Sequence, residues 1–248
     1  MPAAIHIQQL FKTYAGTDAP AVNGLDLMVK EGQFFGLLGP NGAGKTTTLS
    51  ILCGLLEATS GKASVLSHEL PNELSKVKPL LGVVPQDIAL YDTLTARENL
   101  KFYGAMYGIA TKVLNPRITQ LLKEFGLAEK ADKVVGTYSG GMKRRVNLIV
   151  GLLHNPRILF LDEPTVGIDV QSRVMINDYL HKLNTNGTTI IYTSHHMDEA
   201  ERMCDSIGII DHGELIVQGT PSELLTANPD CASLEDIFLK LTGKQLRD

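Results

Sequence analysis

The sequence has few cysteines, no tryptophan and no long apolar run. Its three cysteines, Cys53, Cys204 and Cys231, are far apart and form no Cys-x-x-Cys pair, which argues against a disulfide framework and indicates free thiols in a reducing compartment. No apolar stretch approaches the roughly 18 residues that span a bilayer, and residues 1–14 lack a secretory apolar core. We therefore expect a chain that is soluble by itself and reaches a membrane only through another chain.

The sequence also lacks an excess of basic charge. Its 27 acidic and 23 basic side chains leave a formal net charge of −4. Proteins whose main partner is nucleic acid usually carry a basic surface, so we expect no nucleic-acid partner. With 248 residues, 44% of them hydrophobic, the chain is long enough for one large α/β domain with a sizeable core.

The apolar residues follow two different periods along the chain. Alternation predicts two strands within residues 5–29, and short apolar runs predict further strands at 33–38, 81–84, 158–161, 188–193, 207–210 and 214–217. Helical spacing predicts helices directly after residues 39–46 and at 96–107, 116–125, 141–153, 171–183 and 198–204. Because only helical patterns lie between 87 and 156, we predict a parallel α/β core that is interrupted by a helical subdomain.

A glycine-rich segment, Gly39-x-x-x-x-Gly44-Lys45-Thr46, follows a predicted strand and opens a predicted helix. Glycines let successive backbone N–H groups face phosphate oxygens, and the helix N-terminus adds positive potential. Lys45 supplies a charge for the β- and γ-phosphates, and Thr46 supplies a hydroxyl ligand for Mg²⁺. The segment predicts an ATPase that binds Mg·ATP at this loop; a glycine turn beside a solvated lysine is the alternative interpretation.

Two carboxylates, Asp162 and Glu163, close the apolar run Ile158-Leu159-Phe160-Leu161. A buried parallel strand delivers its last residues to the carboxyl edge of the sheet, where ligands of α/β proteins bind. Asp162 is then placed to reach Mg²⁺, directly or through water, and Glu163 to orient and deprotonate the attacking water. Two solvated acids at a strand end are the alternative.

A second anion site is indicated by Ser139-Gly140-Gly141, which precedes the predicted helix at 141–153. One ATP does not need two such sites. We therefore predict that two chains face each other and that each lends its serine–glycine segment to the γ-phosphate of the other. An ordinary helix N-cap is the alternative.

Taken in order, GPNGAGKTT, Gln86, YSGGM, LFLDE, Asp169 and His195 resemble the nucleotide-binding subunit of ABC transporters over nearly the whole chain. The resemblance implies an α/β P-loop NTPase in which residues 1–248 form one ABC ATPase domain. It implies a RecA-like core with an N-terminal antiparallel β subdomain at about 1–86 and 156–220, an inserted α-helical subdomain at about 87–155 and a C-terminal helical appendage at about 221–248. It also implies a head-to-tail dimer, of two copies or of homologous chains, with ATP between them.

The resemblance assigns a role to single residues. Tyr14 is expected to stack on adenine, Asp169 to link the two sites of the dimer, and His195 to bond the γ-phosphate and position Glu163; Asp169 also suits a helix N-cap. The residues expected to bind ATP are Tyr14, Gly39, Pro40, Asn41, Gly42, Ala43, Gly44, Lys45, Thr46 and Thr47. Those expected to act in catalysis are Lys45, Gln86, Glu163 and His195, those expected to hold Mg²⁺ are Thr46, Gln86 and Asp162, and the signature residues are Ser139, Gly140 and Gly141. Tyr138 and Met142 depart from the leucine and glutamine usual in that signature.

Several stretches, among them SGGMKRRV, LDEPTVGID and SLEDIFLKLTG, resemble the drug- and polysaccharide-exporter branch of the family. This implies an ATPase that powers export through separate membrane permease subunits and lies on the cytoplasmic face of the membrane. Gln86 is expected to touch the membrane partner as well as Mg²⁺ and water. We expect the contact surface between residues 86 and 107, with apolar contacts from Tyr91, Leu94, Leu100, Phe102 and Tyr103.

Two other functions are alternatives for a chain with these motifs. A soluble ABC-type ATPase that acts on ribosomes or DNA resembles two cassettes in tandem or carries long coiled coils, and neither feature is visible in this sequence. A regulatory module that binds ATP without hydrolysis is disfavoured because both Glu163 and His195 are present.

Overall fold

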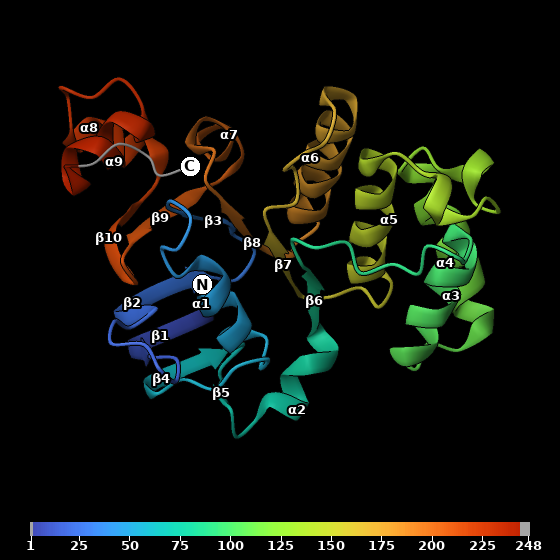
Figure 1. The fold of residues 1–248 in the computed structure, drawn as a ribbon, viewed down its shortest axis with the longest axis horizontal. Coiled ribbons are helices and arrows are strands. Elements are labelled where there is room, and N and C mark those ends of the chain that lie inside the picture. Colours follow the sequence, from blue (N-terminus) through green and yellow to red (C-terminus); the bar gives the residue numbers. More distant parts are fainter. Residues whose placement is uncertain (1, 244–248) are drawn as a thin grey trace.

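The larger sheet of the protein has six strands in the order β10-β9-β3-β8-β7-β6, as seen in a computed structural model that describes residues 2–243 (Figure 1). The contacts between β6, β7, β8, β3 and β9 are all parallel, and β10 pairs with β9 in the antiparallel direction. The strands are β3 (Phe34–Leu38), β6 (Leu81–Val84), β7 (Ile158–Asp162), β8 (Thr189–Ser194), β9 (Ser206–Asp211) and β10 (Glu214–Gly219). Each lies within two residues of its predicted range, so the predicted parallel α/β core is confirmed.

The carboxyl ends of the central strands meet at one edge of this sheet. Every residue of β3, β7 and β8 is buried, as expected for strands covered on both faces. The parallel register sets Leu38 opposite Ser194 and Asp162 opposite Thr193. The segments that follow these three strands carry the glycine-rich loop, Glu163 and His195, and they therefore emerge side by side.

The hydrophobic core occupies both faces of the large sheet. Alternate side chains of β3 belong to different clusters: Phe34 and Leu38 pack with residues of the helical layer, and Phe35 and Leu37 pack with residues of the smaller sheet. This alternation follows from the two-residue repeat of a strand. The sheet is thus held rigidly between two cores, which fixes the edge where the candidate site lies.

The smaller sheet is antiparallel, with strands in the order β2-β1-β4-β5 (Figure 1). Its strands are β1 (Ala3–Lys12), β2 (Val22–Lys30), β4 (Ser60–Val65) and β5 (His68–Leu70). The first two were predicted by alternation, whereas β4 and β5 were missed. β4 begins with three exposed residues, Ser60 to Lys62, and β5 has only three residues, so neither shows an apolar period.

Three helices gather beyond β6 and α6, on the side of the molecule away from α8 and α9 (Figure 1). They are α3 (Ala96–Met106), α4 (Thr111–Glu124) and α5 (Gly140–Leu152). The prediction that α4 starts at Pro116 is wrong, because the helix begins at Thr111 and contains the proline. The apolar face of α4 includes Leu114 and Ile118, which are both buried. A helix that began at Pro116 would not include Leu114. Burial of Leu114 offsets the loss of the backbone hydrogen bond that proline cannot make.

The remaining helices lie around the large sheet and at the C-terminal side. They are α1 (Lys45–Leu52), α2 (Leu74–Val77), α6 (Val170–Thr185), α7 (Met197–Met203), α8 (Pro221–Ala227) and α9 (Leu234–Thr242), with short 3-10 turns η1 (Lys78–Leu80), η2 (Ala128–Lys130) and η3 (Val135–Thr137). Helix α9 packs on both α7 and α8. The predicted helical appendage extends over 221–248, of which residues 244–248 lie outside the described part of the chain. Within residues 2–243, no helix has both the length and the apolar character needed to cross a membrane.

Candidate functional site

The glycine-rich loop joins β3 to α1 and has no room for a side chain at the glycine at either end. Gly44 has φ of +102°, and a Cβ at this position would lie 2.4 Å from the carbonyl oxygen of Ala21. A Cβ on Gly39 would lie 2.2 Å from the carbonyl oxygen of Ile210. Glycine is therefore required at both ends of the loop, for conformation at one end and for close backbone approach at both.

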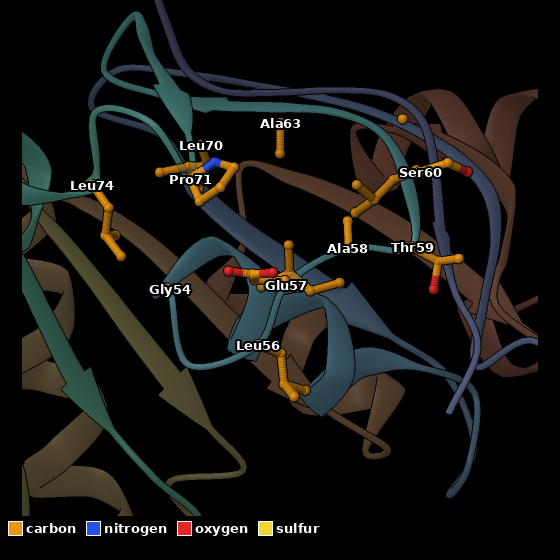
Figure 2. A pocket seen from close by; sticks show the side chains of 13 residues that line it. Gly54, Leu56, Glu57, Ala58, Thr59, Ser60, Ala63, Leu70, Pro71 and Leu74 are labelled. Atoms are coloured by element: carbon orange, nitrogen blue, oxygen red, sulfur yellow. The ribbon is translucent and has the colours of Figure 1, made fainter. Parts of the chain in front are cut away.

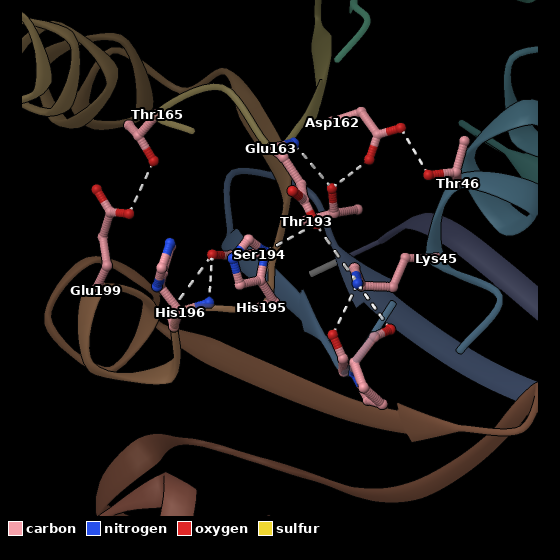
Figure 3. Close-up of polar contacts among 12 residues, drawn as sticks. Lys45, Thr46, Asp162, Glu163, Thr165, Thr193, Ser194, His195, His196 and Glu199 are labelled. Carbon is pink, nitrogen blue, oxygen red and sulfur yellow. Dashed lines mark hydrogen bonds and ion pairs between the residues drawn. The ribbon is translucent and has the colours of Figure 1, made fainter. Parts of the chain in front are cut away.

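Lys45 is buried at the start of α1 with its ammonium group beside the loop (Figure 3). Its Nζ donates hydrogen bonds to the carbonyl oxygens of Gly39 at 2.7 Å and Pro40 at 3.1 Å, and it lies 3.6 Å from Oε1 of Glu163. Burial lowers the pKa of Lys45 below its ordinary value, while the carboxylates of Glu163 and Asp162 act to raise it. The carbonyl groups of the loop therefore hold the Lys45 side chain in place.

Asp162, the last residue of β7, is buried and has both oxygens in hydrogen bonds. Oδ2 accepts from the hydroxyl of Thr46 at 2.8 Å, and Oδ1 accepts from the hydroxyl of Thr193 at 2.6 Å (Figure 3). Carboxylate and hydroxyl oxygens are ligands that Mg²⁺ prefers, usually one or two from the protein together with phosphate oxygens and water. The pair of Asp162 and Thr46 at the mouth of a phosphate loop fits that donor set.

Glu163 directly follows β7 and is buried, in a left-handed backbone conformation with φ of +48°. This conformation is uncommon for a residue with a side chain, and it turns the chain at the end of the strand. Oε1 of Glu163 lies 3.1 Å from Nδ1 of His195, and its backbone N–H donates to the hydroxyl of Thr193 at 3.1 Å (Figure 3). Glu163 therefore lies between the lysine of the loop and the histidine that follows β8.

A hollow of about 330 Å³ opens at this edge of the sheet. Its lining joins the loop to Gln86 and Glu163; the lining residues are Ala21, Asn41, Gly42, Ala43, Gly44, Lys45, Thr46, Thr47, Gln86 and Glu163. Gln86 is exposed in the segment after β6, and Tyr14 is 41% exposed with its hydroxyl 3.2 Å from the hydroxyl of Thr47. The predicted loop, carboxylates, glutamine and histidine thus come together, and Tyr14 lies beside the loop, with Nζ of Lys12 5.6 Å from the centre of its ring.

The predicted signature segment lies elsewhere on the chain. Ser139 caps α5 by accepting from the backbone N–H of Met142 at 3.3 Å, and both Ser139 and Gly140 are exposed and outside the lining of the hollow. A Cβ on Gly141 would lie 2.5 Å from Oδ2 of Asp169, so this glycine permits close packing against the start of α6. Ser139 and Gly140 are thus exposed at the N-terminus of α5, while Gly141 packs against the start of α6. The exposed helix end forms a surface suited to an anion that is bound to another molecule.

Asp169 caps α6 and is exposed beside this segment. Its carboxylate accepts from the backbone N–H of Ser172 at 2.9 Å and from the Ser172 hydroxyl at 2.8 Å. These bonds, the backbone bond first, lower the pKa of Asp169. The predicted N-cap is therefore confirmed, and the role of Asp169 between two sites stays a prediction.

Of the pockets outside the nucleotide site, two lie beside the turn that follows α1. One, of about 380 Å³, is enclosed by β1, the turn after α1, and the β4–β5 region, with Glu57, Pro71 and Leu74 in its lining (Figure 2). The other is an apolar groove of about 550 Å³, lined by Cys53, Leu55, Lys78, Pro79, Leu81, Val83, Pro85, Met106 and Tyr107, and it is called the apolar groove below. None of the predicted nucleotide-binding or catalytic residues lines either pocket.

Thr193 is a site residue that the sequence analysis missed. Its hydroxyl contacts both Asp162 and the backbone of Glu163 and thereby ties the ends of β7 and β8 together. The available signal was its position, because a threonine that ends a predicted buried strand beside another such strand lies at the ligand edge of the sheet.

Comparison with known proteins agrees with this geometry. A family model described as ABC transporter matches residues 22–166. The chain is 50% identical over 203 residues to the linearmycin resistance ATP-binding protein LnrL of Bacillus subtilis, a match that covers 82% of this chain and 65% of that protein. It is 41% identical over 221 residues to the daunorubicin/doxorubicin resistance ATP-binding protein DrrA of Streptomyces peucetius, covering 89% of this chain and 66% of that protein. This chain thus spans just under two thirds of the length of either relative.

Solved structures with the same fold are ATP-binding cassettes. One described as the ATP binding subunit of an ABC transporter has a TM-score of 0.86 at 27% identity and covers 96% of this chain and 99% of its own. A dimeric cassette, MJ0796, in a post-hydrolysis state with ADP and Pi has a TM-score of 0.79 at 27% identity and covers 87% of this chain and 98% of its own. The expected P-loop NTPase fold is confirmed, and the chain belongs to the ABC transporter family as an ATP-binding cassette that hydrolyses ATP.

Proposed function

We propose that this chain powers export through separate membrane subunits, and that two copies, or this chain and a homologous one, close head to tail over two Mg·ATP. One observation carries the shared site: Ser139 and Gly140 are exposed and lie outside the phosphate hollow of their own chain. Export is supported by the printed functions of the relatives, which are resistance and export ATP-binding proteins. In this proposal the division into a core, a helical subdomain at about 87–155 and a C-terminal appendage is the mechanical layout of the cassette.

Within one chain, the loop residues from Gly39 to Thr47 bind the phosphates through backbone N–H groups, and Lys45 adds a charge between the β- and γ-phosphates. Tyr14 supplies a ring face for adenine. Thr46 and Asp162 hold Mg²⁺, and Gln86 lines the same hollow. When bound, the metal neutralises charge that develops on the phosphate oxygens.

Hydrolysis in this proposal depends mainly on positioning and on charge. Glu163 orients the attacking water and accepts its proton. His195, whose Nδ1 is 3.1 Å from Glu163, holds that carboxylate and presents its other ring nitrogen for the γ-phosphate. Loss of the γ-phosphate removes the anion that both chains grip, and the dimer then opens.

Replacing Ser139 with arginine tests the shared site. A bulky side chain at an exposed helix N-cap leaves the hollow of the same chain untouched but obstructs the facing phosphate. We expect unchanged ATP affinity of the monomer and a kcat at least about a hundredfold lower, comparable with losing a donor that stabilises transition-state charge. The measurement is steady-state hydrolysis together with nucleotide affinity at low protein concentration.

The control is Ser222→Arg in α8, which makes the same change at an exposed residue outside the phosphate hollow. A Ser139→Arg protein that hydrolyses ATP at the wild-type rate contradicts the shared site. A protein in which monomer affinity also falls contradicts the assignment of Ser139 to the partner's nucleotide.

For the membrane partner we propose the apolar groove, extended by Tyr91 and by the aromatic side chains of α3. Pro85 links the groove to Gln86, and Met106 at its rim is 70% exposed. Tyr91, Phe102 and Tyr103 form edge-on ring contacts nearby, with Tyr91 48% and Phe102 43% exposed. Leu100, which the sequence analysis included in this surface, is fully buried in the helical layer because it lies on the inner face of α3, and that part of the prediction is wrong.

We expect Met106→Glu to weaken binding to the membrane subunit by at least about tenfold, because a charge placed in an apolar interface loses its water without a partner. Val113→Glu is the matched control, since Val113 on α4 is 58% exposed and does not line the groove. Co-purification of the cassette with its membrane chain, quantified over protein concentration, measures the effect. Equal binding by both variants would place the membrane partner on another surface.

A further inference from the structure

Helix α7 begins directly after the segment that carries His195, and its first turn holds a buried acid, Glu199. Acidic side chains in the first turn of a helix usually face water, where they meet the positive end of the helix. Glu199 is instead 7% exposed and points inward (Figure 3). A buried carboxylate costs considerable free energy unless hydrogen bonds compensate it. The hydrogen-bond donors around Glu199 therefore indicate what this side chain does.

The carboxylate of Glu199 has three donors from three different elements. Oε2 accepts from the hydroxyl of Thr165 at 2.8 Å and from the hydroxyl of Tyr192 at 2.9 Å. Oε1 accepts from Nδ2 of Asn177 at 2.9 Å. Burial and the nearby carboxylate of Glu199 raise the pKa of Tyr192 well above its ordinary value, which keeps its hydroxyl protonated as a donor.

These donors belong to the segments that carry the hydrolytic residues. Thr165 lies two residues after Glu163 and four before Asp169, Tyr192 lies three residues before His195, and Asn177 is on the helix that Asp169 caps. Glu199 itself lies four residues after His195. The buried side chain of Glu199, in the first turn of α7, thus contacts the segment after β7, the strand β8 and the helix α6.

We propose that Glu199 is a positioning residue for hydrolysis, which fixes the segment after Glu163 and the segment around His195 relative to each other. Its side chain does not line the nucleotide hollow. It acts on the 3.1 Å contact between Glu163 and His195, which crosses from one of these segments to the other. A misplacement of about 1 Å in such a contact lowers a rate by about a hundredfold while ground-state binding through the phosphate loop is kept. This inference rests on the proposed roles of Glu163 and His195.

The structure supplies a specific test of the contact between Glu199 and Asn177. Oδ1 of Asn177 is buried and has no hydrogen-bond partner among residues 2–243. In Glu199→Gln, the amide oxygen still accepts from Thr165 and Tyr192, and rotation of the Asn177 amide by a half-turn presents Oδ1 to the new N–H₂ group. Asn177→Asp, in contrast, sets two carboxylates against each other. Combining Asn177→Asp with Glu199→Gln restores one carboxylate and one amide in exchanged positions.

The experiment measures kcat, KM and Mg·ATP affinity of the full chain, over a range of protein concentration because the proposed site needs two copies. For Glu199→Ala we expect kcat to fall about ten- to a hundredfold while KM and affinity stay within about threefold. For Asn177→Asp we expect a fall of about tenfold, which the double variant brings back to within about threefold of wild type. For Glu199→Gln alone we expect a kcat within about threefold of wild type.

Asn184→Ala is the control for general loss of partly buried side-chain hydrogen bonds, because the side chain of Asn184 donates to the carbonyl oxygens of Gly32 and Thr188 at the far end of α6. If Glu199→Ala retains kcat, or lowers it no more than Asn184→Ala does, the positioning role is wrong. If Glu199→Ala does not fold, the double variant with Asn177→Asp and Glu199→Gln tests the positioning role instead. A kcat restored toward the wild-type value supports the contact between the two residues, and a double variant as slow as Asn177→Asp overturns the proposal. A wild-type chain without ATPase activity contradicts the proposed function instead, so the two failures are distinguishable.

Discussion

Replacing Glu163 with glutamine is expected to lower kcat for ATP hydrolysis by about 10²–10⁴-fold, the usual contribution of a general base. The substitution keeps the shape of the side chain and its contact with His195, but an amide does not accept the proton of water. It also removes a negative charge that lies 3.6 Å from Lys45, so the ammonium is less neutralised and ATP binds at least as tightly as in the wild type. With binding retained and hydrolysis slow, we expect a long-lived dimer in the presence of Mg·ATP.

Size-exclusion chromatography with light scattering measures the dimer, and phosphate release measures kcat. Glu129→Gln, at an exposed glutamate in η2, is the matched control and is expected to behave like the wild type. A Glu163→Gln chain that remains monomeric and releases phosphate at the normal rate would refute the assignment of the base. Loss of ATP affinity instead would show that the carboxylate serves the fold of the loop.

Much of the large sheet was predictable because its strands are covered on both faces. The segments that became β3 and β7 are short apolar runs, and the middle of β8 is Ile190-Ile191-Tyr192, so each segment indicates a strand that is buried on both faces. β4 could not be found in this way. It pairs with β1 through backbone hydrogen bonds while residues 60–62 stay exposed, so its position is decided by the neighbouring strand and not by its own side chains.

In the candidate site too, some residues are recognised from their neighbours in the sequence and others only from the folded structure. The loop at Gly39–Thr46 and the pair Asp162–Glu163 have local patterns whose chemistry is direct, and the structure places them at one edge. The left-handed turn at Glu163 and the inward direction of Glu199 have no local signature. From sequence, Glu199 is one of several acids in the run Asp198–Glu201, and only the approach of Thr165, Tyr192 and Asn177 from distant elements singles it out.

Substitution of Lys45 is expected to have the second large effect, which is a loss of ATP affinity. Lys45→Ala removes an ammonium group whose bonds to phosphate oxygens are charge-assisted, each about 1.5–3 kcal/mol, so we expect ATP affinity to fall by about ten- to a hundredfold and hydrolysis with it. Lys62→Ala, at an exposed lysine of β4, is the control. Titration with a fluorescent ATP analogue measures the affinity, and an unchanged value contradicts the assignment of the loop.

The pH dependence of binding distinguishes a lost charge from a damaged loop. Burial lowers the pKa of Lys45 in the nucleotide-free chain, so its ammonium loses a proton at lower pH than an exposed lysine does, and the neutral amine attracts phosphate weakly. Wild-type affinity is therefore expected to decline at pH values below the ordinary lysine pKa of about 10.4, where an exposed lysine still keeps its proton. Lys45→Ala has no such proton to lose and is expected to show a flatter profile over the same range. Parallel profiles for the two proteins would mean that another group titrates, and that the charge of Lys45 does not control how the loop holds ATP.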